Sequence, residues 1–209
     1  MIIISHRGYW KSQEEKNIKI SFERSFKLGY GTETDIRDYN EELVISHDIP
    51  DENSLKIDDF FKIYNSYSNP NLTLALNIKS DGLQSKLKEK LIEFGVENYF
   101  VFDMSIPDTL GYLRNNLRVY TRHSEYEPIP AFYEESQGVW LDAFESTWYD
   151  GDVILDHLKK GKYVAIVSSD LHKRNHLDLW TYLKSNNYHK LDNIILCTDL
   201  PEDATEFFK

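Results

Sequence analysis

The sequence predicts an α/β fold, a compact (β/α)8 TIM barrel with a β-hairpin inserted after its second strand. Short β-rich runs alternate with segments of helical periodicity, two of these runs lie too close together for a parallel crossover, and 209 residues suit one domain, residues 1–209. Alternating β and α segments are typical of a parallel sheet, and eight such units are typical of a closed barrel. A doubly wound open sheet is the structural alternative.

Nine runs have the apolar, β-branched and aromatic composition of strands. They span residues 2–5, 31–36, 43–46, 73–77, 99–103, 118–121, 138–142, 163–167 and 194–197. Only six residues separate 31–36 from 43–46, whereas a parallel crossover needs about a dozen or more. The run 43–46 is therefore expected to return antiparallel, in a hairpin that turns near Asn40 and Glu41. Eight strands remain for the barrel.

Helical segments fill most of the intervals between these runs. In 57–64, apolar residues recur at i, i+3, i+4 and i+7, and in 82–94 a leucine stripe ends before Gly95. Asp150 is expected to cap the helix that follows it, and a last helix is expected after Pro201.

Composition narrows the class of partner and the compartment. The chain has 24 Lys+Arg against 35 Asp+Glu, a net charge of −11, which argues against nucleic acid because such binding needs basic residues on phosphates. No apolar run approaches the length of a membrane span. The apolar stretch 1–4 is too short for a signal peptide, so a cytoplasmic location is expected. The single Cys197 lies in an apolar run and is expected to be a buried structural thiol.

Polar residues gather where the predicted strands end. Side chains two residues apart share a face of a strand, so Glu33 lies with Asp35, and Asn77 lies with Lys79. In a parallel barrel these ends open on one mouth, where such enzymes place their chemistry. Solvation and helix capping explain any one of these residues. They do not explain two carboxylates on one strand face beside two histidines.

The hairpin is expected to bring His47 to the same carboxylates. A tight turn at Asn40 and Glu41 pairs residues whose numbers add up to 81, which places Ser46 opposite Asp35. His47 then lies beside Asp35. A slip of one residue would move every side chain to the other face.

The residue types at this mouth favour chemistry on a phosphate ester. Glu33 and Asp35 offer hard oxygen ligands that suit Mg²⁺ or Ca²⁺, and the sequence has no Cys/His set with zinc spacing. His6 and His47 are candidates for an acid/base pair, because imidazole holds or releases a proton near neutral pH. Arg7 and Lys79 supply positive charge for phosphate oxygens.

Four motifs follow one another in the first 48 residues. They are S-H-R-G (5–8), F-x-x-S-F (22–26), G-x-E-T-D-I-R (31–37) and L-V-I-S-H-D (43–48). In order and spacing they resemble the N-terminal signature of the glycerophosphodiester phosphodiesterase family, which belongs to the phosphatidylinositol phospholipase C-like barrels. The segment L-A-L-N-I-K (74–79) resembles the family's next motif, a strand with an acidic ligand and a lysine.

The resemblance implies a divalent-cation cofactor, Mg²⁺ or Ca²⁺, and hydrolysis of a glycerophosphodiester or a similar small phosphodiester. By position, it implies that the general acid and base are His6 and His47, that the metal ligands are Glu33, Asp35 and Asn77, and that the phosphate oxygens are held by Arg7 and Lys79.

Two positions depart from the family's pattern. The family's Pro-Glu-Asn-Thr before the first helix is matched with residues 18–21, I-K-I-S, so Lys19 stands where an acidic residue is expected. Lys19 then either contacts phosphate or is exposed. Asn77 replaces the third acidic ligand, and its amide oxygen coordinates a cation without adding charge. Metal binding is therefore expected to be weaker, or more dependent on substrate phosphate.

Two other functions stay open. A catalytically impaired phosphate-binding or regulatory relative would explain Lys19 and Asn77. A barrel hydrolase of non-phosphate substrates would use Asp103 and Asp142 as acid and base, but nothing in the sequence sets their separation. The remaining histidines have no strong partner in the sequence and are expected to be surface or structural residues: His123, His157, His172, His176 and His189.

Overall fold

The structure is a computed structural model that describes all residues, Met1–Lys209. The strands are β1 Ile2–His6, β2 Gly31–Tyr39, β3 Glu42–Ile45, β4 Leu55–Lys56, β5 Leu74–Ile78, β6 Tyr99–Phe102, β7 Tyr120–His123, β8 Gly138–Leu141, β9 Tyr163–Val167 and β10 Ile194–Thr198. The helices are α1 Lys19–Lys27, α2 Ile57–Ser66, α3 Gln84–Glu93, α4 Ile106–Arg114, α5 Gly151–Lys159, α6 Leu177–Ser185 and α7 Pro201–Phe208. Three short 3-10 helices are η1 Gln13–Glu15, η2 Ser169–His172 and η3 Tyr188–Lys190.

The chain packs as two compact units. One is Ser5–Val119, and the other joins Met1–Ile4 to Tyr120–Lys209. Strands alternate with helices in both units, and the strands that helices connect run parallel. The predicted α/β fold is therefore confirmed. The single domain and the closure of the strands into a barrel stay predictions.

In the unit Ser5–Val119, β2 pairs in parallel with β5, and β5 pairs in parallel with β6. The register places Asp35 beside Asn77 and Glu33 beside Ala75. Because successive side chains point to opposite faces, this register puts both carboxylates and the amide on one face. The outward face of the same strands carries the apolar residues Leu74 and Leu76.

The β2–β3 hairpin has the predicted register. Ile36 pairs with Ile45 and Tyr39 pairs with Glu42 in antiparallel fashion. The turn residues Asn40 and Glu41 have φ of 48° and 66°, the left-handed conformation that two-residue hairpin turns use to match the twist of their strands. The two-residue strand β4, which pairs with β3, was not predicted because it is too short for a periodic signal.

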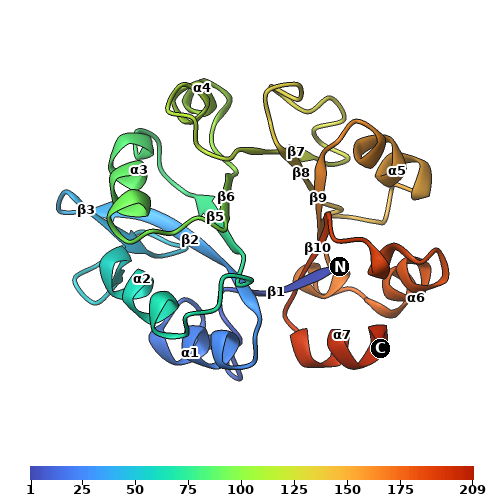
Figure 1. Cartoon of the computed structure of the whole chain (residues 1–209), viewed down its shortest axis with the longest axis horizontal. Helices are drawn as coiled ribbons and strands as arrows, with labels where there is room; N and C mark the ends of the chain where they lie inside the picture. Colours follow the sequence, from blue (N-terminus) through green and yellow to red (C-terminus); the bar gives the residue numbers. More distant parts are fainter. The chain divides into compact units, whose positions relative to one another are not determined.

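Helices α1, α2 and α3 cover the outer face of β2, β5 and β6 (Figure 1). Phe22 of α1 packs edge-on against Phe60 of α2, with ring centroids 4.6 Å apart, and both rings are fully buried. The four apolar positions expected on α2 are all buried. The leucine stripe is buried at Leu87 and Leu91 of α3, which supports the strand face opposite the carboxylates.

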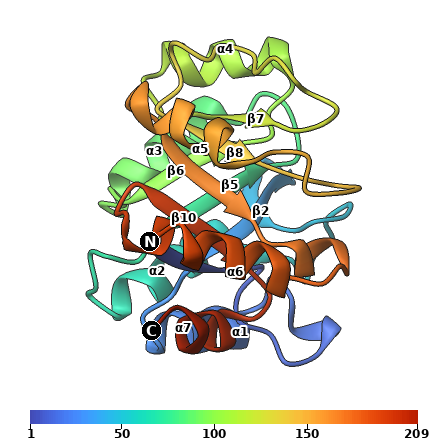
Figure 2. The same cartoon turned by 90° about the vertical axis from the view of Figure 1, so that its right-hand side faces the viewer.

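In the other unit, β7, β8, β9 and β10 pair in parallel in that order, and α6 lies beside α7 in Figure 2. Trp180 of α6 and Ile194 of β10 lie in its core. Asp150 caps α5 as predicted, since its carboxylate accepts hydrogen bonds from the first-turn backbone. Cys197 is buried and free, as expected.

Two histidines in this unit form a hydrogen-bonded chain that the sequence did not indicate. His123 Nδ1 lies 2.9 Å from His157 Nε2, and the Tyr133 hydroxyl lies 2.7 Å from His157 Nδ1. With the phenol as the donor to Nδ1, the tautomer of His157 that carries its proton on Nε2 donates to His123. Burial, with His123 adding to it, lowers the pKa of His157 to about 4. Both are structural residues, as expected, and their partners come from distant segments of the sequence.

The buried, hydrogen-bonded His157 predicts that acid destabilises the fold. The pKa of His157 is lower in the folded protein than its ordinary value of 6.5, so protonation favours the unfolded chain. The free energy of unfolding should fall by about 3 kcal/mol as the pH drops from 6.5 to 4. Urea denaturation across this range should show the loss in the wild type and a flatter profile in His157→Gln. Equal slopes in the two proteins would contradict the assignment.

Candidate active site

The seven predicted site residues all lie in the unit Ser5–Val119. They are His6, Arg7, Glu33, Asp35, His47, Asn77 and Lys79. Glu33 and Asp35 of β2 and Asn77 of β5 form the floor of the site, and less than a tenth of each is exposed. Because both carboxylates are out of water, the groups around them decide their charge.

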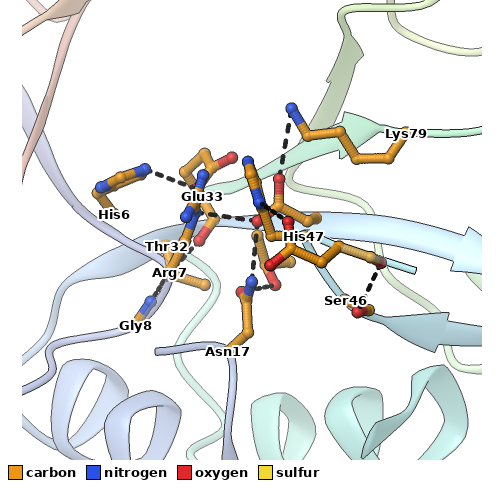
Figure 3. A network of polar contacts seen from close by, with 12 residues as sticks. His6, Arg7, Gly8, Asn17, Thr32, Glu33, Ser46, His47 and Lys79 are labelled. Atoms are coloured by element: carbon orange, nitrogen blue, oxygen red, sulfur yellow. Dashed lines mark hydrogen bonds and ion pairs between the residues drawn. The ribbon is translucent and has the colours of Figure 1, made fainter. Parts of the chain in front are cut away.

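The end of β1 turns sharply over these carboxylates. The Arg7 backbone N–H donates to the Glu33 carbonyl at 2.9 Å, and Arg7 has a left-handed φ of 57°. This turn brings Arg7 Nε to 3.0 Å from Asp35 Oδ2 and His6 Nε2 to 3.9 Å from Glu33 Oε2. Figure 3 shows His6 beside Glu33. A non-glycine residue in this conformation costs roughly 1–2 kcal/mol, a strain found at functional sites.

Gly8 makes this turn possible. Its φ is 78°, and a Cβ there would collide with the Ser21 side chain. Its N–H donates to the Thr32 hydroxyl at 2.9 Å, which ties the turn to β2. The S-H-R-G motif is therefore a strand end followed by a turn that only glycine completes.

The hairpin delivers His47 to the same place. The Ser46 N–H donates to the Asp35 carbonyl at 3.0 Å, which confirms the predicted pairing. Figure 3 shows His47 between Arg7 and Lys79. His47 is partly exposed, and its Nδ1 lies 2.8 Å from the Asp48 carboxylate. The contact favours the tautomer that carries its proton on Nδ1 and leaves Nε2 as the acceptor.

Lys79 follows β5 and bridges two carboxylates. Its Nζ lies 3.5 Å from Asp35 Oδ1 and 4.0 Å from Asp103 Oδ2, at the end of β6. The Lys79 backbone N–H donates to the Ile36 carbonyl, which continues the β2–β5 ladder past the last paired residue. The lysine is thus held by the sheet on its backbone and by carboxylates at its tip.

Asn17 is a site residue that the sequence analysis missed. Its amide nitrogen donates to Asp35 Oδ2 at 2.8 Å, and its amide oxygen accepts from the Thr34 hydroxyl at 2.9 Å. Its backbone N–H donates to the Arg7 carbonyl, and its φ is 60°. Asparagine is among the residues that tolerate this conformation. An asparagine in a loop just before a helix was therefore the one feature of the sequence that could have indicated a sharp turn at this position.

Lys19 is not part of the site. Its side chain is 67% exposed, and Nζ lies 3.6 Å from Glu23 one turn along α1. Of the two interpretations of this lysine, the exposed one is confirmed.

Electrostatics distinguishes the two carboxylates. Burial, together with the negative charge of Asp35, raises the pKa of Glu33 to about 7, and this outweighs the opposing effect of His6 and Arg7. Asp35 instead contacts two cations, Arg7 and Lys79. A proton is therefore exchanged at Glu33 near neutral pH, while the site keeps its fixed ion pairs at Asp35.

Three oxygen atoms of the floor fit a divalent cation. Glu33 Oε2, Asp35 Oδ1 and Asn77 Oδ1 are buried and accept no hydrogen bond. Carboxylate and amide oxygens are the ligands that Mg²⁺ and Ca²⁺ prefer. The chain has no cluster of three or more His, Cys, Asp or Glu side chains arranged for a metal ion. A cation here would therefore depend on the amide oxygen as its third protein ligand.

No protein-family model matches the chain, and no curated protein is similar to it in sequence. Solved structures are similar to it in fold. A glycerophosphodiester phosphodiesterase from Parabacteroides distasonis ATCC 8503 has a TM-score of 0.72 at 18% identity, over 99% of this chain and 96% of that chain. One from Agrobacterium tumefaciens str. C58 has a TM-score of 0.71 at 13% identity, over 99% and 98%.

The chain has the fold of the glycerophosphodiester phosphodiesterases. A glycerophosphoryl diester phosphodiesterase from Parabacteroides distasonis, at 13% identity and a TM-score of 0.65, agrees over 99% of this chain and 85% of that chain. The resemblance drawn from the motifs is thus confirmed in the fold. At these identities the likeness establishes the fold and leaves the substrate and the catalytic residues to be argued from the site.

Another histidine–carboxylate pair lies in the second unit. His172 Nε2 is 2.7 Å from Asp142 Oδ1, which also accepts a hydrogen bond from the Ala143 backbone. His172 has no partner near it in the sequence, and Asp142 lies 30 positions away along the chain. The pair joins the end of β8 to η2, and Asp142 is accounted for by these contacts.

The raised pKa of Glu33 predicts that this residue destabilises the metal-free fold when it is ionised. Below pH 4.5 it is protonated in both the folded and unfolded states, and the cost grows as the pH rises to about 7. Glu33→Gln should therefore raise the free energy of unfolding by about 1–3 kcal/mol at pH 8 and by little at pH 4. Urea denaturation of metal-free protein at both pH values checks this. A gain that is the same at both would contradict it.

Proposed function

We propose that the protein is a divalent-metal-dependent phosphodiester hydrolase that acts on a glycerophosphodiester or a similar small phosphodiester. The observation that carries this proposal is the convergence of two histidines, two buried carboxylates and two cations on one face of β2 and β5. The fold shared with glycerophosphodiester phosphodiesterases supports it.

Arg7 and Lys79 would hold the phosphate oxygens. Both side chains contact the Asp35 carboxylate, which holds their positive charges next to each other at the site. An arginine guanidinium presents parallel N–H donors to two phosphate oxygens, and an ammonium acts as a compact charge. Together they would bind and orient the phosphate through its non-bridging oxygens.

Glu33, Asp35 and Asn77 would hold the divalent cation. When bound, such a cation stabilises negative charge on a phosphate oxygen as a Lewis acid. The two carboxylates also position neighbouring side chains of the site. Asp35 pairs with Arg7, and Glu33 lies next to the His6 imidazole.

His6 and His47 would act as general acid and base. One imidazole takes the proton of the attacking hydroxyl, from water or from a neighbouring substrate hydroxyl, and the other gives a proton to the leaving alkoxide. His6 Nε2 lies 3.9 Å from Glu33 Oε2, and His47 Nδ1 lies 2.8 Å from Asp48 Oδ1. Each imidazole thus has a carboxylate beside it that would help to orient the ring.

A cavity beside His47 suits a small leaving alcohol. It measures about 400 Å³ and is lined by site residues, including Arg7 and Asn17, and by polar side chains such as Gln13 and Asn53. A cavity of this size is near the lower end of ligand pockets, roughly 300–1,000 Å³. It supports a headgroup alcohol as one half of the substrate.

The class of partner follows from the same features. No helix has the length and apolar character needed to cross a membrane. With a net charge of −11, a small phosphodiester fits better than a nucleic acid, because a single phosphate needs only the local charges of Arg7 and Lys79. A cytoplasmic location is part of the proposal.

A catalytically impaired phosphate-binding relative is the second candidate. The observation that favours it is the amide at Asn77, which leaves the floor with two carboxylates. Calorimetry separates the two functions, because a binding protein would take up a phosphodiester without turnover, and Asn77→Glu would not create activity.

Substitution of either histidine should strongly reduce turnover. His6→Ala and His47→Ala should each lower kcat on a glycerophosphodiester by about 10²–10⁴-fold, since each removes one proton transfer. Release of the alcohol with Mg²⁺, Ca²⁺ or Mn²⁺, and after chelation, gives the measurement. Lys19→Ala is the control and should keep full activity, because the Lys19 side chain is exposed and pairs with Glu23 on α1. Unchanged turnover in both histidine variants would refute the assignment.

A further inference from the structure

Lys79 occupies a place between two carboxylates. Its ammonium lies 3.5 Å from Asp35 Oδ1 and 4.0 Å from Asp103 Oδ2. Asp35 Oδ1 is also one of the three buried oxygens that accept no hydrogen bond and fit a divalent cation. The lysine therefore stands at the oxygen that the cation would take, and two like charges would compete for it.

The charges of the floor make this competition costly. Two carboxylates, Glu33 and Asp35, face two fixed cations, Arg7 and Lys79, and the amide of Asn77 adds no charge. A divalent cation would thus enter a floor whose two carboxylates, when both are ionised, are already balanced by two cations. Binding needs either a further negative charge or a way to move Lys79 off Asp35.

Asp103 offers both a further negative charge and an alternative partner for Lys79. It directly follows Phe102 of β6, which is aligned with Asn77 of β5, so its carboxylate lies one strand away from the amide. Its side chain is 12% exposed, and its φ is 67°. Arg7 and Asn17, which also surround the floor, share this left-handed conformation. Backbone held in this region clusters at functional sites.

We propose that Asp103 supplies the third negative charge of the cation site by taking over Lys79 when a divalent cation occupies Asp35 Oδ1. The missing charge at position 77 is thereby provided from the next strand. Asp103 is a positioning residue, since it acts through Lys79. The inference rests on the cation site of the proposed function and concerns how this chain fills it.

Mn²⁺ binding to the metal-free protein tests this inference without any assay of turnover. In isothermal titration calorimetry, Asp103→Asn should weaken Mn²⁺ binding roughly tenfold, the effect of one charge at short range. Asparagine has the same shape as aspartate and accepts the left-handed conformation, so the fold should be kept, and urea denaturation checks this. Asp59→Asn, at an exposed position on α2 of the same unit, should bind as the wild type does.

Lys79→Met identifies the route. With the ammonium removed, Asp103→Asn should weaken Mn²⁺ binding by less than twofold. An equal loss in both backgrounds would overturn the route through Lys79, and unchanged binding in Asp103→Asn alone would overturn the inference while leaving the proposed hydrolase intact. Asp35→Asn tests the proposed cation site separately from the role of Asp103. Wild-type Mn²⁺ affinity in that variant would show that the cation binds elsewhere and would overturn the proposed cation site as well.

Discussion

The carboxylate of Asp35 is fully buried, and its ion pairs and hydrogen bonds set the arrangement of the candidate site. Arg7 and Asn17 contact one oxygen, and Lys79 lies near the other. A buried charge without partners costs several kcal/mol, so the folded unit is stable only if these three side chains converge. They come from three separate segments, after β1, before α1 and after β5. Pairing of one carboxylate therefore gathers the cations and fixes the loops together.

The backbone is arranged to allow this convergence. Arg7, Asn17 and Asp103 all adopt positive φ, in loops next to the strand ends. At each of these residues the left-handed conformation turns the backbone sharply, so that the chain bends toward the floor of the site. A regular strand or helix has no such bend. The regular elements provide rigidity instead: the β2–β5 register fixes the carboxylates, and the aromatic contacts of α1 and α2 hold the opposite face of the same unit. Strain in the loops is balanced by packing in the core.

Much of the site could be predicted because it follows from the regular alternation of side chains along a strand and from the pairing of residues across a hairpin. The period of two along a strand places Glu33 with Asp35, and the hairpin pairing places Ser46 opposite Asp35; the structure has both. These features are local, so the sequence contains all the information they need. The strand and helix positions were predictable for the same reason, apart from β4, with its two residues.

The residues that were missed depend on contacts between distant segments. Asn17 lies in an irregular loop, where no periodicity indicates the direction of a side chain, and only its partner Asp35 gives it a role. The sequence offered Asp103 only as an acid or base for non-phosphate substrates, and its relation to Lys79 emerges only from the spatial order of β5 and β6. His123 and His157 are 34 residues apart and meet only after folding.

The division of β1 has a consequence for the order of folding. Residues 2–4 belong to the unit that contains β10, and the Met1 amino group donates to the His189 carbonyl, 188 positions along the chain. His6 sits two residues beyond, on the same strand. Contacts of such long range form late, because closing a long loop costs entropy before the contact compensates for it. The pairing of β1, the strand that carries His6, with β10 is therefore expected to form late in folding.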